Sequence, residues 1–365
     1  FDQTGVGPDF TGTIIIIDGV PYSTLPQSFA WEINTVHTFA FQSPLLVNGK
    51  RYVWTSTTGL SNQQSGSITV TTYGSILGHY KTQYYLTLAT NPPGVDAPTG
   101  AGWYDAGTYA PISTDALVNI VPGSSRYRFN GWTTADMSEI TNPSASSTTV
   151  LMDKAKTVTA KYVIQYYFGV SSPSNSPPYG GPIPAPPGDW FDAGTEITAS
   201  VTSPWPGPAG TRYVCTGWNG TGSVPSSGTG TSVTFTLNEP SSIIWNWKTQ
   251  YYLTVQTNAP TTIPGEGWYD NCTTVPLTAP YVAKYEFDYW DIDGISQGDD
   301  VETITVHMNA PHTATAHYHK IVIGPPVGGY SVSLAEPAET PPIIGYTMIL
   351  AMFGVAITLI RRKRK

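Results

Sequence analysis

The sequence predicts an all-β protein, a tandem array of four small β-rich modules followed by a single C-terminal transmembrane helix. Short runs rich in Val, Thr, Tyr and Ile alternate with dense turn residues, and 36 Gly and 32 Pro occur in 365 residues. Aromatic residues make up 12% of the chain, which argues against intrinsic disorder. Several short motifs also recur in a fixed order along the chain, which indicates repeated modules.

Each repeat carries four signatures in the same order. A strand opens at Gln-Tyr-Tyr, an aromatic residue then precedes an acidic turn, an aromatic-rich strand leads to a tryptophan, and an alternating strand closes the unit on an aromatic residue. The first three signatures begin at Gln83, Gly102 and Tyr127, at Gln165, Asp189 and Tyr213, and at Gln250, Gly267 and Tyr285.

The repeat is long enough for each unit to have a core of its own. Its period is near 83 residues, well above the 20 to 50 residues that are typical of a solenoid. The predicted repeat modules are residues 83–164, 165–248 and 249–320. Residues 1–82 form a divergent N-terminal module, which lacks the Gln-Tyr-Tyr opening. The repeated Trp132, Trp218 and Trp290 are expected to fill the cores of the repeat modules.

The C-terminal part has the pattern of a membrane anchor. Residues 321–342 are rich in proline and predict an extended stalk. Residues 343–360 carry no charge and are long enough, at about 27 Å as a helix, to cross a bilayer. The five residues 361–365 are all basic, which predicts a cytoplasmic tail and an extracellular body on a single-pass protein of the cell membrane. A buried core helix is the alternative for 343–360.

The repeat signatures resemble the divergent internalin-B-type repeat of bacterial and archaeal surface proteins. The resemblance covers residues 83–319 well and 11–82 loosely. It implies small β modules in tandem on secreted or anchored proteins, and it implies no catalytic residues. The combination with a proline-rich stalk, one helix and a short basic tail is similar to that of archaeal surface proteins in particular.

The charge of the body argues against nucleic-acid binding. The chain has 17 Lys and Arg and 25 Asp and Glu. Without the five basic residues of the tail, 12 positive charges face 25 negative ones, a balance of −13. A phosphate backbone is bound by clusters of Lys and Arg, so we expect no nucleic-acid partner.

One acidic cluster is a candidate calcium site. Calcium prefers six to eight oxygen ligands, and carboxylates gather in the sequence DYWDIDGISQGDD. The same loop is poor in carboxylates in the other modules, so a plain polar loop is the alternative, and we expect no other cofactor. The pair His317 and His319 has metal-ligand spacing but lies at an ordinary strand end. The candidate calcium ligands are Asp288, Asp291, Asp293, Asp299 and Asp300.

Two cysteines and two sequons are candidate modification sites. Cys215 and Cys272 are the only cysteines, and in an extracellular body they are candidates for a disulfide between the third and fourth modules, with two separate thiols as the alternative. Asn219 and Asn271 begin Asn-x-Thr sequons in predicted turns, which makes them candidates for glycosylation.

These features favour a non-enzymatic surface protein, structural or adhesive, with a stiff extracellular rod. No flexible spacer separates one predicted module from the next. Other envelope proteins or surface glycans are the expected partners. The first alternative is a carbohydrate-binding array, in which Trp103, Trp190 and Trp268 stack on sugars, although the same residues also suit module junctions. The second is the anchor fragment of a larger surface enzyme whose catalytic domain precedes Phe1.

Overall fold

The structure is a computed structural model that describes residues 1–173, 177–322 and 324. The predicted helix at 343–360, the basic tail at 361–365 and nearly all of the predicted stalk at 321–342 lie outside these residues. Within the described part, no helix has the length and apolar character needed to cross a membrane.

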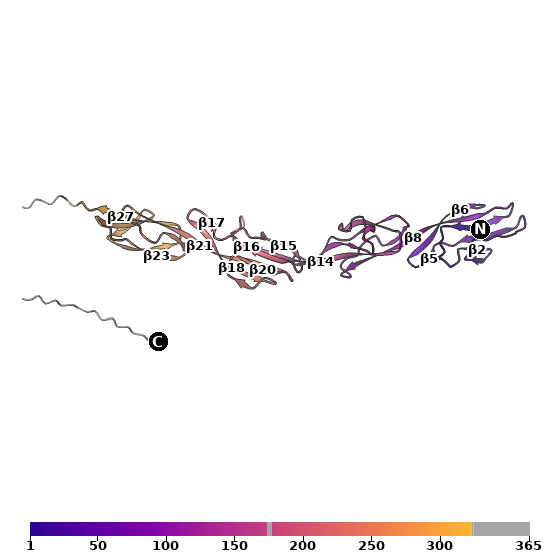
Figure 1. The fold of residues 1–365 in the computed structure, drawn as a ribbon, viewed down its shortest axis with the longest axis horizontal. Coiled ribbons are helices and arrows are strands. Elements are labelled where there is room, and N and C mark those ends of the chain that lie inside the picture. Colours follow the sequence, from indigo (N-terminus) through magenta and orange to yellow (C-terminus); the bar gives the residue numbers. More distant parts are fainter. Residues whose placement is uncertain (174–176, 323, 325–365) are drawn as a thin grey trace, which may run out of the picture.

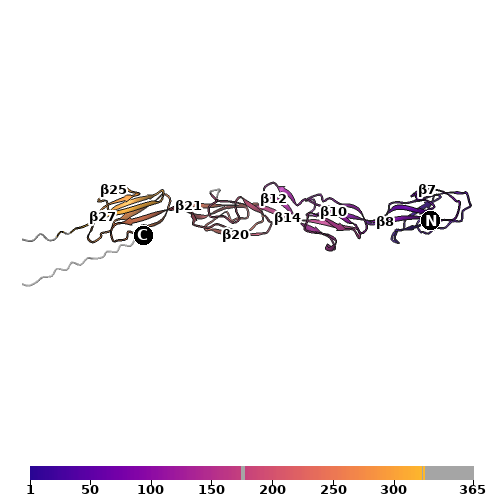
Figure 2. The ribbon, with the colours of Figure 1, turned by 90° about the horizontal axis from the view of Figure 1, so that it is seen from above.

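The predicted all-β class is confirmed for the described residues. They contain strands β1 to β27 and one short 3-10 helix, η1 (Met137–Glu139). Four hydrophobic cores follow one another along the chain, and each draws its residues from one stretch of sequence. Figures 1 and 2 show the corresponding modules in a row along the longest axis of the molecule, in two views at right angles.

The N-terminal module packs two sheets against each other. One is a four-stranded sheet in the order β3-β2-β4-β7, and the other includes β5, β6 and β8, with β1 parallel to β8. Ile15, Phe41 and Tyr52 fill the space between them. The strands are β1 (Asp2–Thr4), β2 (Ile15–Ile17), β3 (Val20–Tyr22), β4 (Val36–Phe41), β5 (Leu45–Val47), β6 (Lys50–Gly59), β7 (Ser65–Thr69) and β8 (Ile76–Asn91).

In the second module, a two-stranded antiparallel sheet of β10 and β13 takes the place of the four-stranded sheet. Ala110 and Ile112 alternate inward from β10, and they meet Trp132, which is 1% exposed. The second half of β8 pairs in parallel with the first half of β14. The new strands are β9 (Gly102–Asp105), β10 (Tyr109–Ser113), β11 (Leu117–Val121), β12 (Ser125–Thr133), β13 (Ser147–Leu151) and β14 (Lys156–Ser171).

The third module repeats this arrangement. The pair β16 and β20 lies over the sheet that contains β14, β18 and β21, and β14 is again parallel to the following long strand. Trp218 and Trp245 are both buried in its core. The new strands are β15 (Gly188–Asp192), β16 (Glu196–Ser200), β17 (Trp205–Pro206), β18 (Thr211–Thr221), β19 (Ser227–Gly228), β20 (Ser232–Thr236) and β21 (Ser241–Thr257).

The fourth module has the same plan around Trp290, which is completely buried. Its closing strand, β27, runs parallel to β21, and β23 pairs with β26. The expectation that Trp132, Trp218 and Trp290 fill the cores is therefore confirmed. The new strands are β22 (Gly267–Asp270), β23 (Thr273–Thr278), β24 (Tyr285–Ile292), β25 (Ile295–Asp299), β26 (Thr303–Met308) and β27 (His312–Lys320).

Candidate functional site

The joints between modules are built on strands that belong to two modules at once. β8, β14 and β21 are 16 or 17 residues long, and the sequence boundaries 82/83, 164/165 and 248/249 fall near their middles. At the first joint, β6 of the N-terminal module pairs with one side of Gln83 and Tyr84, while β9 of the second module pairs with the other side. A three-stranded sheet therefore crosses the joint without interruption.

The other two joints have the same backbone arrangement. Gln165 lies between β12 and β15, and Gln250 lies between β18 and β22. In addition, the hairpin tip of each earlier module accepts a hydrogen bond from the second tyrosine amide of the later module. These bonds run from Tyr85 N to Gly49 O, from Tyr167 N to Ser124 O and from Tyr252 N to Gly210 O, at 2.9–3.0 Å.

A hydrogen-bonded chain of three side chains, Arg, Gln and Asp, crosses each joint. At the first, Arg51 Nε donates to Gln83 Oε1 at 2.7 Å, and Gln83 Nε2 donates to Asp105 Oδ1 at 2.7 Å. The glutamine uses its acceptor toward one module and its donor toward the next, so it links the two. The equivalent trios are Arg126, Gln165 and Asp192, with distances of 2.8 and 2.9 Å, and Arg212, Gln250 and Asp270, with distances of 2.8 and 2.7 Å.

The second carboxylate oxygen of each joint aspartate accepts from a cation. Lys81 Nζ lies 3.0 Å from Asp105, and Lys248 Nζ lies 2.8 Å from Asp270. The middle joint has Val163 where the others have lysine, and there Arg128 lies 2.7 Å from Asp192.

The middle joint therefore exchanges two residue types between neighbouring strands. Arg128 is the cross-strand neighbour of Val163, whereas the lysines of the other joints face Val53 and Val214. The cation is supplied from one strand or from the other, and the carboxylate keeps its partner at all three joints.

These contacts lower the pKa of all three joint aspartates. For Asp105 the largest cause is the hydrogen bond from Gln83, followed by that from Lys81. For Asp192 the pKa is lowered mainly by Arg128, whose own pKa is raised in return. For Asp270 it is lowered first by Lys248 and then by Gln250.

The tryptophans proposed from the sequence as sugar platforms are half-buried parts of the joints. The guanidinium carbon of Arg51 lies 4.5 Å from the ring centre of Trp103, and the corresponding distances are 4.1 Å for Arg126 over Trp190 and 4.5 Å for Arg212 over Trp268. Tyr85, Tyr167 and Tyr252 meet these rings edge to face. An arginine therefore covers one side of each ring, and stacking on a sugar is left to the other.

The predicted calcium cluster is not assembled. No group of three or more His, Cys, Asp or Glu side chains in the described part of the chain is placed to hold a metal ion. Three of the five carboxylates pair with separate histidines of the closing strand, β27. The pairs are Asp288 with His319 at 2.6 Å, Asp291 with His317 at 2.5 Å and Asp293 with His312 at 2.6 Å.

The other two acidic residues of that cluster lie elsewhere on the hairpin. Asp299 is exposed at the end of β25, opposite Tyr289, and Asp300 follows it with a φ of 61°. The register shift between Phe287 and Tyr289 separates Asp288 from the regular alternation of β24. Carboxylates that are adjacent in sequence consequently point to different neighbours.

The proposed disulfide between Cys215 and Cys272 is not formed, because both cysteines are free. Cys215 lies on β18, which pairs with one side of β21, while Cys272 follows β22, which pairs with the other side. Two strand spacings separate these lines of backbone by about 10 Å. A disulfide requires Cα atoms within about 7 Å, so the intervening strand prevents it.

Both sequon asparagines are exposed. Asn219 lies on strand β18 rather than in a turn, and Asn271 lies in the turn after β22, where its amide donates to Thr249 O at 2.9 Å. Glycosylation at these two positions stays a prediction.

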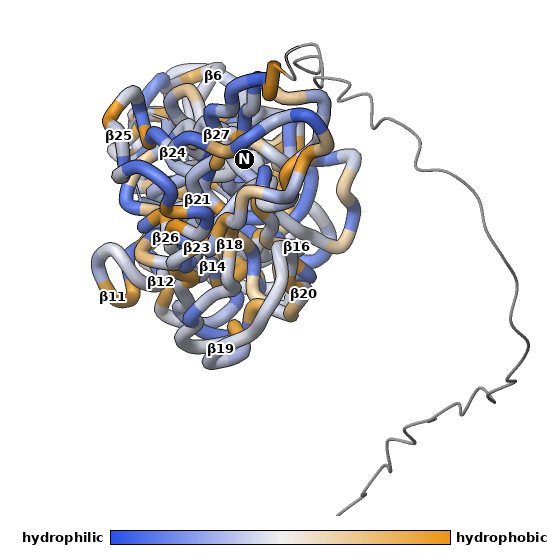
Figure 3. Tube along the Cα trace, turned by 90° about the vertical axis from the view of Figure 1, so that its left-hand side faces the viewer, coloured by the Kyte–Doolittle hydropathy of each residue, from blue (hydrophilic) through white to orange (hydrophobic). Residues whose placement is uncertain are grey.

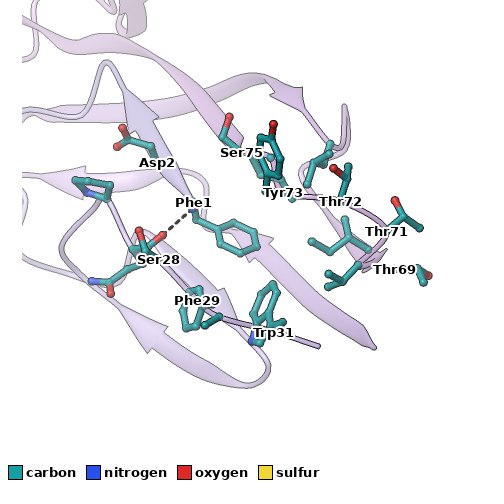
Figure 4. Close-up of a pocket in the computed structure, with 18 of the residues that line it drawn as sticks. Phe1, Asp2, Ser28, Phe29, Trp31, Thr69, Thr71, Thr72, Tyr73 and Ser75 are labelled. Carbon is teal, nitrogen blue, oxygen red and sulfur yellow. Dashed lines mark hydrogen bonds between the residues drawn. The ribbon is translucent and has the colours of Figure 1, made fainter. Parts of the chain in front are cut away.

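A pocket that sequence reasoning missed lies in the N-terminal module. It has a volume of about 710 Å³ and is lined from two sides by aromatic and hydroxyl side chains (Figure 4). Asp2 supplies the one charged side chain of the lining. Phe29 stacks on Trp31 at 4.9 Å between ring centres, and Tyr73 is 98% exposed. Hydroxyl groups come from Thr69, Thr71, Thr72, Ser28 and Ser75.

Comparison with known families agrees with the repeat geometry. The family described as the divergent InlB B-repeat domain matches residues 94–165 and residues 251–322. The chain thus contains two divergent InlB-type repeats, and the resemblance inferred from its motifs is confirmed for these segments. Comparison with the curated proteins and with the solved structures gave no match.

Proposed function

We propose that this protein is a non-catalytic, membrane-anchored protein of the cell surface that presents its four modules as a stiff extracellular rod. InlB-type repeats suggest a surface repeat protein. The proposal adds three things to this: the anchor, the stiffness and a structural or adhesive role.

The three joints carry the proposal. Each has an uninterrupted strand, the same Arg-Gln-Asp chain and the same Arg-covered tryptophan. A flexible linker needs length and residues that free the backbone, whereas these joints have strand pairing on both sides. The middle joint also retains a cation on Asp192 although the lysine is missing. Such repetition favours modules that are held in a fixed relative orientation.

The anchor follows from the sequence. An uncharged segment at 343–360 with a basic tail at 361–365 fits a single-pass helix with the body outside the cell. The proline-rich residues 321–342 would add a spacer of about 60 Å at the rise of an extended chain. A rod on such a spacer suits contact with other envelope proteins or with surface glycans.

Protease treatment of intact cells tests the topology. The cells produce the full chain with one epitope in an exposed turn of the body and another after Lys365. We expect external protease to remove the first epitope and to leave the second on a short membrane-bound fragment. Permeabilised cells, which should lose both epitopes, are the control. A body that survives on intact cells but not on permeabilised ones would contradict the orientation.

Carbohydrate binding is a second candidate function, favoured by the pocket of the N-terminal module. Stacked aromatic rings and neutral hydroxyl groups are the lining that sugar faces and sugar hydroxyls prefer. A glycan-array screen of the purified protein tests it, with Tyr73→Ala as the matched variant because Tyr73 is 98% exposed and supports little of the fold. Glycan binding that Tyr73→Ala weakens would support this function, and an array without any signal would remove it.

A further inference from the structure

One strand edge of the second module differs from the equivalent edges of the first and third modules. β11 pairs only with β12 among the described strands, and in the view along the array it projects from the side of the molecule (Figure 3). Its sequence is Leu-Val-Asn-Ile-Val, without a charged residue. Leu117, Ile120 and Val121 are 49%, 43% and 52% exposed. An exposed apolar strand edge is a template for pairing with another strand.

The equivalent edges of the neighbouring modules are protected. In the N-terminal module the corresponding strand is β5, with only three residues. In the third module it is β17, with two residues, in a segment that contains Pro204, Pro206 and Pro208. Proline has no amide hydrogen to donate, so it blocks pairing at an edge. Only the second module combines five residues with no proline and no charge.

We propose that β11 pairs with β11 of a second copy of this chain, so that two arrays associate side by side. The strand is nearly symmetric about Asn119, because Leu117 and Val118 mirror Val121 and Ile120 in character. An antiparallel pair on a two-fold axis at Asn119 therefore places apolar residues opposite apolar residues and Asn119 opposite its own copy.

The backbone N–H and C=O groups of β11 point in the directions that this pairing needs. Phe129 N donates to Ala116 O at 2.9 Å, so the peptide groups of Ala116 face β12. In an antiparallel ladder the groups of alternate residues point to opposite sides, and those of Leu117 and Asn119 are directed to the free edge. A hydrogen-bonded pair of Asn119 with its copy can then form on the axis. The register shift beyond Asn119 confines the regular pairing to this central part.

The partner's chemistry follows from the same residues. A strand with no charge offers nothing to select an acidic or basic peptide, while an apolar edge with a polar centre fits another copy of itself. The proposal does not depend on the membrane anchor, and it concerns the described residues alone.

Cysteine cross-linking of the full chain tests the pairing. The native thiols are replaced in Cys215→Ala and Cys272→Ser, and Asn119→Cys is added. Directly opposed residues of a hydrogen-bonded antiparallel pair have Cα atoms about 5.5 Å apart, which is within the range of a disulfide. Mild oxidation should give a covalent dimer. Asn219→Cys in the same background is the matched control, since Asn219 is also exposed on a strand, and it should stay monomeric.

A charge on the edge supplies the second arm. Ile120→Lys, added to the Asn119→Cys protein, should reduce the covalent dimer by at least about tenfold, because like charges then approach each other across the axis. Circular dichroism checks that this exposed substitution leaves the fold intact. Dimer formation no greater than in the Asn219→Cys control, or undiminished by Ile120→Lys in a folded protein, would overturn the proposal.

Discussion

Arg128 of the second module and Asp192 of the third form an ion pair of 2.7 Å, at the one joint where valine replaces the lysine of the other two. Arg128 lies directly across the strand pair from Val163, and the lysines of the other joints lie directly across from valines. At the middle joint the positive charge comes from the neighbouring strand, while its carboxylate partner occupies the same position at all three joints. This exchange indicates that the joint depends on a cation at this carboxylate rather than on a particular residue.

The exchange predicts a rescue. Arg128→Val should weaken the middle joint by about 0.2–1 kcal/mol, the range of a partly exposed ion pair. Adding Val163→Lys rebuilds the arrangement of the other joints and should restore the loss. Hydrogen exchange of the β14 amides around Gln165 measures both effects. Equal exchange in the parent and in Arg128→Val, or no recovery in the double variant, would show that the ion pair does not stabilise the joint.

Replacing Cys272 with glycine should stabilise the fourth module. Cys272 has a φ of 67° in a turn where the earlier modules have Gly107 and Gly194, with φ of 78° and 84°. This left-handed conformation costs a residue with a side chain roughly 1–2 kcal/mol. The greater freedom of glycine in the unfolded chain offsets part of the gain, so we expect Cys272→Gly to stabilise by about 0.5–1 kcal/mol.

The reverse substitution in the third module is the control. A Cβ at Gly194 would meet no atom within 4 Å, so Gly194→Ala changes the backbone preference without a steric clash. It should lower the urea midpoint of the third module by an amount similar to the gain from Cys272→Gly. A stability that rises in Cys272→Gly and falls in Gly194→Ala supports the conformational explanation. Changes in the same direction in both variants contradict it.

Acid should loosen the joints. The pKa of Asp105, Asp192 and Asp270 is lowered from the ordinary 3.8 by hydrogen bonds that the unfolded chain lacks. The unfolded chain therefore binds more protons in acid, and the stability that these groups contribute is complete above pH 3.8 and is lost as the pH falls through the folded pKa. When the pH is lowered from 5 to 2, the urea midpoint should fall less in Asp192→Asn than in the parent protein. Identical pH profiles would exclude Asp192 as a source of the acid sensitivity.

The two thiols should differ in reactivity. Cys272 is exposed, whereas Cys215 is half-buried and burial raises the pKa of its thiol. Since the thiolate is the reactive form, Cys215 should alkylate much more slowly at neutral pH. Mass spectrometry after a short treatment without reductant should find label on Cys272 first. If neither cysteine is labelled until a reductant is added, a disulfide exists and the separation by β21 is wrong.

The sequence was sufficient to predict the all-β class and the repeated core tryptophans. The reason is that these depend on local alternation and on motifs that recur, such as those around Trp132 and Trp290. The Arg-Gln-Asp chain was missed although its members also recur, at Arg51, Gln83 and Asp105 and in two further trios. Its members lie on three strands from two modules, and their lateral order is set by sheet pairing rather than by sequence spacing.

The same limit explains the two site predictions that did not hold. The disulfide needed Cys215 and Cys272 on neighbouring strands, and β21 lies between them. The calcium prediction relied on carboxylates that are close together in one segment of sequence. The histidines that pair with three of them lie 19 to 31 residues away in the chain. Aligning the repeats would have revealed the recurrent Arg before the Tyr127-type position, in addition to the Gln and Asp that the repeated motifs already contain.

Small-angle scattering of residues 1–320 tests whether the joints hold the modules as a stiff row. For a stiff row we expect a radius of gyration well above 20 Å, a distance distribution with a long tail and a linear cross-section plot. A compact body of this length would have a radius of gyration of about 20 Å. That value would contradict the account, as would scattering that fits only a flexible chain of independent modules.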